Sequence, residues 1–171
     1  MIRLLLIALL STVSLSCEVL TPVAPTSGGA PGASSPGGTK SGASTPADFV
    51  AELALCVDET NRYRASAGRP PLARSDALDG FAAEAARQDA LMHQAHYYFK
   101  LTNGHGIARA ENEILWWKGF PIRDVVEQGI AQMWRSGPSG EHYDIIVGSY
   151  TQLGCGIYVN GGEVTVAQDF R

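Results

Sequence analysis

Residues 141–159, EHYDIIVGSYTQLGCGIYV, decide the fold because they end in a strand with a clear alternation. Every second position is apolar, as expected where one face of a sheet is buried: Leu153, Cys155, Ile157 and Val159. Asn160-Gly161-Gly162 then suits the positive φ values of a tight turn, and the alternation restarts at Val164 and Val166. The sequence therefore predicts a two-stranded antiparallel hairpin at this end of the chain.

A histidine stands just ahead of the predicted hairpin. His142 follows a stretch rich in Gly, Pro and Ser at residues 136–140 and precedes an apolar run. Segments of that composition form loops at the surface. We therefore expect His142 at the mouth of the fold rather than in its core.

Three amphipathic helices are predicted upstream of the hairpin. Apolar residues recur at helical spacing over residues 49–67 and again over residues 75–93, where Ser75 is placed to cap the helix. A third helix follows Pro121. The residues alone thus predict an α+β domain.

The first residues have the composition of a secretory signal. Arg3 precedes an apolar block at residues 4–10 and small residues up to Cys17. The block is too short for a spanning helix, which needs about 20 apolar residues. Cys17 resembles the lipidated cysteine of bacterial lipoproteins, although Ser14 stands where leucine is usual. We expect an exported, membrane-anchored lipoprotein, periplasmic or at the cell surface; cleavage before Cys17, giving a secreted protein, is the alternative.

A low-complexity stretch separates this signal from the rest of the chain. Residues 21–45 are almost entirely Pro, Gly, Ser, Thr and Ala, a composition that cannot bury enough apolar area to fold. The expected organisation is therefore a signal peptide at 1–16, the lipidated cysteine and linker at 17–46, and one folded domain at 47–171. A net charge of −4 and a pI near 5.5 argue against a nucleic-acid partner.

Two cysteines remain once Cys17 is assigned to lipidation. Cys56 lies on the predicted first helix and Cys155 on the hairpin, each on a presumed core face. In an oxidising compartment such a pair is expected to form a disulfide. Two buried free thiols are the alternative.

Four motifs occur in an order that resembles the CAP superfamily of cysteine-rich secretory proteins, antigen 5 and pathogenesis-related-1 proteins, also called SCP-like. They are TNRYRASAGRPPL at 60–72, ARAENEI at 108–114, a helix ending in VEQGIAQMW at 126–134, and GEHY at 140–143 followed by YTQLGCGI at 150–157. The resemblance covers residues 49–170 and is closer to the bacterial branch. It implies a three-layer α-β-α sandwich with a central antiparallel sheet.

The resemblance also implies a cleft lined by histidine and acid. Its residues would be His96, Glu111, Asn112, His142 and Tyr143. Of these, His96, Glu111 and His142 are the expected metal ligands, and two imidazoles with a carboxylate suit zinc. The second glutamate of many CAP domains is missing after Trp134, and Glu141 is a candidate to replace it. His93 or His105 could stand in for His96 if the motif aligns differently.

Three functions are compatible with such a cleft. The family resemblance favours a non-enzymatic binding module that holds a divalent metal and a lipid or partner ligand. A zinc-dependent hydrolase with Glu111 as ligand or base is the second hypothesis. A purely structural envelope protein is the third.

Two further sequence features admit more than one interpretation. His93 and His96 are three residues apart and would share a face on a helix, although such a pair is more often exposed or satisfied than metal-binding. The pair Trp116-Trp117, with Phe120 nearby, could form an edge that faces lipid or sugar, or could divide between core and surface.

Overall fold

The computed structural model describes residues 48–171, so the predicted signal, Cys17 and most of the linker lie outside the described residues. In chain order the elements are α1 (Val50–Ser66), β1 (Ala73–Arg74), α2 (Asp76–Met92), α3 (Tyr97–Thr102), the 3-10 turn η1 (Asn103–Gly106), β2 (Ala110–Lys118), α4 (Ile122–Arg135), the 3-10 turn η2 (Gly137–Ser139), α5 (Glu141–Ile146), β3 (Gln152–Asn160) and β4 (Glu163–Phe170).

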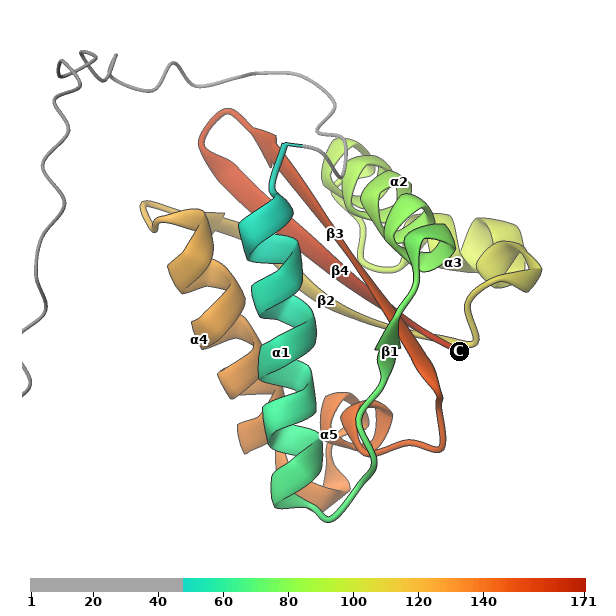
Figure 1. Ribbon diagram of the computed structural model, residues 1–171. Helices are drawn as coiled ribbons and strands as arrows, with labels where there is room; N and C mark the ends of the chain where they lie inside the picture. Colours follow the sequence, from blue (N-terminus) through green and yellow to red (C-terminus); the bar gives the residue numbers. More distant parts are fainter. Residues whose placement is uncertain (1–47) are drawn as a thin grey trace, which may run out of the picture. The chain divides into compact units, whose positions relative to one another are not determined.

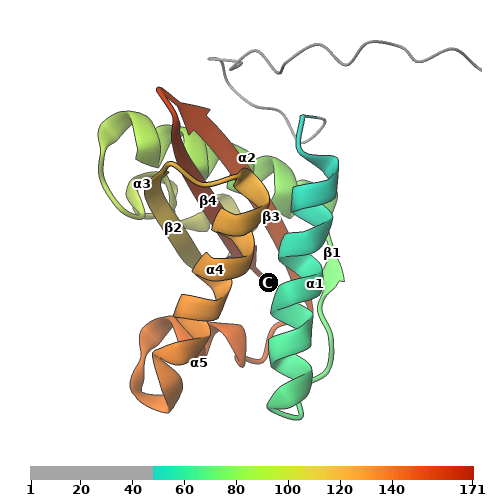
Figure 2. The same cartoon turned by 90° about the vertical axis from the view of Figure 1, so that its left-hand side faces the viewer.

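The elements form three layers, as expected. The sheet has the strand order β1-β3-β4-β2, with α1 and α4 on one face and α2 and α3 on the other (Figures 1 and 2). β3, β4 and β2 pair antiparallel, and the predicted hairpin is confirmed. The short strand β1 pairs parallel with β3, so the sheet is antiparallel except at this edge.

The face beneath α1 and α4 holds the main apolar core. Side chains at alternate positions of β3 and β4 pack there against both helices, and Leu53, Ile130, Ile157 and Val166 are almost fully buried. The predicted disulfide is present: Cys56 on α1 is bonded to Cys155 on β3, with an S–S distance of 2.06 Å. A covalent bond therefore ties this helical layer to the sheet.

The opposite face of β3 is built from glycine. Because side chains alternate along a strand, the residues between the apolar positions point towards α2, and two of them are Gly154 and Gly156. A Cβ at Gly154 would lie 2.2 Å from the backbone carbon of Leu78, and one at Gly156 would lie 2.1 Å from that of Ala82. The glycines thus let α2 lie directly on the backbone of the sheet.

The second helix begins and ends close to the predicted positions. The Ser75 hydroxyl accepts a hydrogen bond from the Leu78 backbone N–H at 3.5 Å, which confirms the cap. The helix ends at Met92, and His93 and His96 both adopt left-handed backbone conformations. The expectation that these two histidines share a helix face is therefore wrong, because the helix has ended before either of them.

The adjacent tryptophans separate at an irregularity in β2. The register with β4 shifts between Ile114 and Trp117, and Trp116 has φ = 56°. Trp116 stacks on the imidazole of His93 with 4.0 Å between ring centroids, whereas Trp117 tilts against Phe120. The regular part of β2 therefore ends before Trp116.

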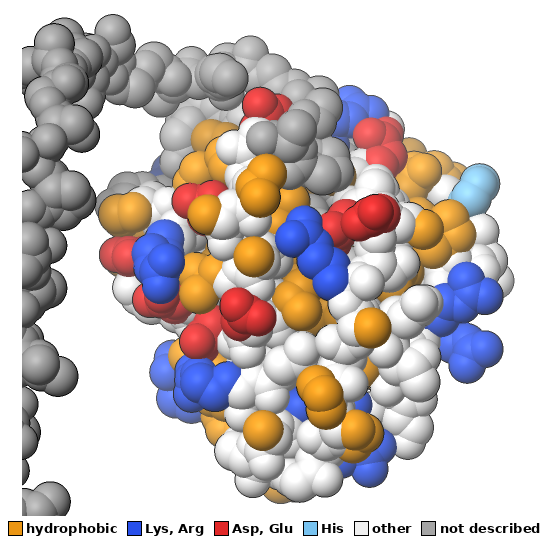
Figure 3. Space-filling model, viewed as in Figure 1, with side chains coloured by type: hydrophobic (Ala, Val, Ile, Leu, Met, Phe, Trp, Pro, Cys, Tyr) orange, Lys and Arg blue, Asp and Glu red, His pale blue; other side chains and the backbone are white. Residues whose placement is uncertain are grey.

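The surface seen in Figure 3 carries acidic and basic side chains intermixed, with no large field of one sign. Within residues 48–171, no helix combines the length and the apolar character needed to cross a bilayer.

Candidate metal centre

Two glutamates on β2 form the base of the candidate site. Glu111 and Glu113 are two residues apart on a strand, so both side chains point to the same face of the sheet, towards α2 and α3. They are only 5% and 8% exposed. This spacing is the signal in the sequence for Glu113, and it becomes visible only when the Glu-Asn-Glu segment is taken as a strand.

His96 meets both glutamates from the loop ahead of α3. Its Nδ1 atom lies 2.9 Å from Glu111 Oε1 and 3.3 Å from Glu113 Oε2. Its backbone N–H donates to Glu113 Oε2 at 2.7 Å. The left-handed conformation of His96, with φ = 55°, presents the ring and the backbone N–H to the same pair of acids.

These three residues form a candidate ligand set. One ligand atom from each of His96, Glu111 and Glu113 lies within 4.8 Å of the others, and no other such group occurs in residues 48–171. An imidazole nitrogen and carboxylate oxygens are the ligands that zinc commonly takes in proteins.

Two more buried carboxylates lie close to this set. Asp169 on β4 is the cross-strand partner of Glu111, which places two acids side by side on the same face. The side chain of Asp89 on α2 is close enough to raise the pKa of Glu113, and it accepts a hydrogen bond from the backbone N–H of Tyr98 at 2.7 Å. Both aspartates are fully buried. Four acids therefore share one desolvated region.

Burial makes ionisation of this cluster unfavourable. Desolvation, followed by the contact with Asp89, raises the pKa of Glu113 to about 10. Desolvation also raises the pKa of Glu111 and holds the pKa of Asp169 well above its usual range, with a further contribution from neighbouring acids. The cluster thus favours a proton or a cation among its oxygens.

Several oxygens of the cluster lack a hydrogen-bond partner. Among residues 48–171, no donor reaches either carboxylate oxygen of Asp169, nor one oxygen each of Asp89, Glu111 and Glu113. Buried polar atoms are normally satisfied, because an unpaired one costs free energy. This side of the sheet therefore carries acceptors that the protein itself does not pair.

A cleft opens beside these residues along the outer strand β2. One hollow of about 570 Å³ has His96, Glu113, Glu141 and His142 in its lining, together with apolar side chains. A second hollow of about 450 Å³ shares His96 and Glu141 and extends to Glu111 and Asp144. The candidate ligands thus lie at the wall of an open cleft.

Residues 57–170 match the CAP family, described as the cysteine-rich secretory protein family. This chain belongs to the CAP family. The matched residues cover the sheet, both hollows of the cleft and Cys155 of the disulfide, so the family assignment concerns the folded domain itself.

Solved structures to which this chain is similar include the following three. An outer surface protein from Borrelia burgdorferi has a TM-score of 0.53 and 17% identity, over 72% of this chain and 95% of that one. A cysteine-rich secretory protein from Staphylococcus aureus has a TM-score of 0.46 and 13% identity, over 70% of this chain and 38% of that one. Hookworm Platelet Inhibitor has a TM-score of 0.48 and 14% identity, over 69% of this chain and 67% of that one. At 17% identity the first likeness shows the fold alone. No curated protein matches the sequence.

The other predicted residues of the CAP cleft, His142, Asn112 and Tyr143, lie outside the three-residue ligand group. His142 lines the larger hollow but is not part of the three-residue ligand group. Asn112 is buried and its Nδ2 donates to the His142 carbonyl at 3.2 Å, which ties α5 to β2. The Tyr143 ring packs on Trp134 with centroids 4.6 Å apart. Glu113, rather than Glu141, is the acid that joins His96 and Glu111.

The remaining histidines lie outside the ligand group. His93 stacks on Trp116, and His105 is exposed on η1. The structure therefore favours the alignment that places His96 at the cleft.

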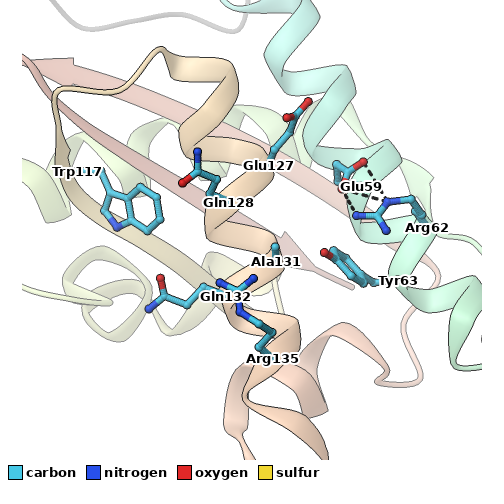
Figure 4. A pocket seen from close by; sticks show the side chains of 9 residues that line it. All are labelled: Glu59, Arg62, Tyr63, Trp117, Glu127, Gln128, Ala131, Gln132 and Arg135. Carbon is cyan, nitrogen blue, oxygen red and sulfur yellow. Dashed lines mark hydrogen bonds and ion pairs between the residues drawn. The ribbon is translucent and has the colours of Figure 1, made fainter.

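Another hollow of about 570 Å³ lies between α1 and α4 and shares Trp117 and Gln132 with the larger hollow of the cleft (Figure 4). Its lining includes the ion pair of Arg62 with Glu59, the ring of Tyr63, and Arg135. Tyr63 is already stacked on Trp134 at 5.0 Å. The polar groups that line this hollow thus already have partners or face solvent, and none of the four buried acids is among them.

Proposed function

We propose that this chain is an exported CAP-domain binding module whose cleft holds a divalent cation through His96, Glu111 and Glu113. The disulfide supports export, because such bonds persist in oxidising compartments. Lipidation at Cys17 would attach the module to a membrane, in the periplasm or at the cell surface. A lipid or partner ligand would then contact the apolar wall of the cleft formed by Ile114, Leu115 and Met133.

The observation that carries the proposal is the convergence of three ligand atoms. Tetrahedral zinc, with bonds of about 2.0–2.1 Å, needs ligand atoms roughly 3.3 Å apart. The distances from His96 Nδ1 to the two carboxylates are 2.9 and 3.3 Å. The donor set thus has ligand types that zinc takes, and two of its three spacings are close to this value.

The unpaired oxygens around this set support the same proposal. A cation at the ligand group would neutralise part of the charge that Asp89 and Asp169 add beneath it. Without a cation, the cluster has to be protonated, because four buried carboxylates cannot all remain charged. Cation binding and protonation are therefore competing states of one site.

The test is a zinc titration by calorimetry on the full chain, compared with His96→Ala and Glu113→Gln. Wild type is expected to bind, and both substitutions to weaken binding about tenfold or more. His105→Ala is the matched control, because His105 is exposed and lies outside the cluster. Circular dichroism checks that each variant is folded. A folded wild type that does not bind zinc would contradict the proposal and leave the structural envelope role.

A hydrolase is the second candidate function, and Glu113 is the observation that favours it. No acid directly follows Trp134, but Glu113 adds a second acid beside Glu111. Bound zinc supplies Lewis-acid chemistry and activates water. Glu113 could accept a proton in such a site, since one of its oxygens has no partner among residues 48–171. Zinc-dependent turnover of peptide or ester substrates, lost in Glu113→Gln, would establish this activity.

A further inference from the structure

The outer side of β2 is a sheet edge that borders the cleft. β2 is the last strand in the order β1-β3-β4-β2 and pairs only with β4. Its regular part, residues 110–115, runs along both hollows. An unpaired edge presents backbone donors and acceptors in a row.

The hydrogen-bonding phase of β4 decides which β2 residues face outwards. Arg171 and Gln152 exchange both of their backbone hydrogen bonds, at 3.0 and 2.9 Å. Because pairing alternates along an antiparallel strand, Asp169 also faces β3, whereas Phe170 and Gln168 face β2.

The partners of those two residues on β2 are Ala110 and Asn112. Glu111 and Glu113 therefore turn their backbone N–H and C=O groups away from the sheet, into the cleft. Within residues 48–171, no loop or side-chain hydrogen bond reaches these outward backbone groups. The same two residues that carry the buried carboxylates thus offer two free donor and acceptor pairs.

The helix across the smaller hollow is acidic. Glu141 and Asp144 on α5 are three residues apart, share a helix face, and are both exposed to the cleft. Lys100 is the one lysine or arginine in the lining of this hollow. The cleft therefore combines a backbone edge with negative charge.

We propose that the cleft binds an extended basic peptide segment, which pairs with the free edge of β2 and places lysine or arginine side chains against Glu141 and Asp144. Backbone pairing gives affinity in this mode of recognition, and side-chain contacts give specificity. At roughly 3.4 Å per residue, the edge from 110 to 115 accommodates about six residues. The proposal takes its location from the cleft of the proposed function but needs no bound cation.

Charge at this edge also explains selectivity. Edge strands commonly avoid unwanted pairing through charged residues and bulges. Here the irregularity at Trp116 and the acids beside the cleft oppose pairing with apolar or acidic strands. A basic strand is the exception, because its charges are complementary to the same residues.

The peptide test uses a fluorescein-labelled hexapeptide of alternating valine and lysine, blocked at both ends, and the full chain. Anisotropy is measured in EDTA and in zinc. Replacing lysine by glutamate is expected to weaken binding about tenfold or more. Methylating every peptide nitrogen keeps the side chains and charges but removes the donors, and is also expected to weaken binding about tenfold or more. Equal binding of the methylated peptide would overturn the proposal.

The protein test reverses charge on α5. Glu141→Lys with Asp144→Lys is expected to weaken the lysine peptide about tenfold or more and to strengthen the glutamate peptide. Asp58→Lys with Asp76→Lys is the matched control, since both residues are exposed and line neither hollow of the cleft. An equal loss of peptide affinity in the control would mean that only net charge matters, and would contradict a binding site at Glu141 and Asp144.

Hydrogen exchange locates the contact. The Glu111 and Glu113 amides should exchange fast in the free chain and slowly with the lysine peptide, whereas Asn112 is already protected by β4. Protection without peptide that rises with protein concentration would mean that a second copy pairs at this edge, against the proposal. If zinc does not bind but the lysine peptide still binds in EDTA, only the cation site is overturned. If zinc binds but the peptide does not, only the peptide proposal is overturned.

Discussion

The two faces of the sheet differ in what they bury. Beneath α1 and α4 the alternate residues are mostly large and apolar, with Asn112 and Gln168 as buried polar residues among them, and the disulfide crosses the interface. Beneath α2 the corresponding residues are glycine and alanine near β3, and acids near β2. One face gains stability mainly from apolar burial, whereas the other buries four carboxyl groups, of which five oxygens have no partner among residues 48–171.

The difference shows how the domain separates stability from function. The cross-linked apolar face holds the strands in register, so the other face can carry groups that lower stability. Buried acids without partners are typical of sites that bind or react. The following predictions test that division.

The largest effect is expected from the disulfide. Cys56→Ala with Cys155→Ala removes a cross-link that spans 99 residues, and the free energy of unfolding should fall by about 4.7 kcal/mol in the chain-entropy model. Urea unfolding followed by circular dichroism measures it. A loss below about 1 kcal/mol would mean that the apolar face does not depend on the cross-link.

Close packing on the second face gives the next effect. Gly156→Ala puts a Cβ 2.1 Å from the α2 backbone, so the helix must move, and we expect a loss of about 3 kcal/mol. Gly80→Ala on the same helix meets no atom within 4 Å and should gain about 0.5–1 kcal/mol from helix propensity. Equal effects of the two substitutions would contradict the contact of α2 with the strand backbone.

The buried acids predict that the free energy of unfolding, measured in EDTA, falls as pH rises. The folded pKa of Glu113 is about 10 against an ordinary value of 4.5, so the folded state binds this proton more tightly. Its contribution to stability is complete below about pH 4.5 and is lost as pH rises towards 10.

Glu113→Gln removes that titration while keeping an acceptor for the His96 backbone N–H. The variant should be more stable than wild type by about 1–2 kcal/mol at pH 8, and its stability should fall less steeply with pH. Urea unfolding between pH 5 and 9 compares the two chains. Parallel pH profiles would show that ionisation of Glu113 does not lower the stability of the folded state.

The smallest effect is expected at the outer surface of α1. Arg62 and Glu59 form an exposed ion pair, and such pairs contribute little because water screens them. Arg62→Ala should change the free energy of unfolding by less than about 0.5 kcal/mol. A larger loss in urea unfolding would show that this surface contributes to the apolar layer beneath it.

Periodicity made much of the fold predictable. The hairpin and three long helices follow from spacing, and Cys56 and Cys155 from their places on core faces. The short helices α3 and α5 have six residues each, too few for a periodic signal. β2 was missed because its buried acids hide the alternation of an ordinary strand.

The site was predictable only in part. His96 and Glu111 follow from the family motifs, whereas their meeting with Glu113 depends on the strand conformation of β2 and the left-handed backbone of His96. Asp89 and Asp169 are brought close by tertiary packing, which no local pattern reveals.

The most direct test of the cation site is the stability of the full chain with and without zinc at pH 7. Zinc at 100 times its dissociation constant should raise the free energy of unfolding by about 2.7 kcal/mol relative to EDTA, since only the folded state assembles His96, Glu111 and Glu113. The rise should largely disappear in Glu113→Gln. No rise in wild type, or an equal rise in the variant, would contradict a cation site on the acidic face of the sheet.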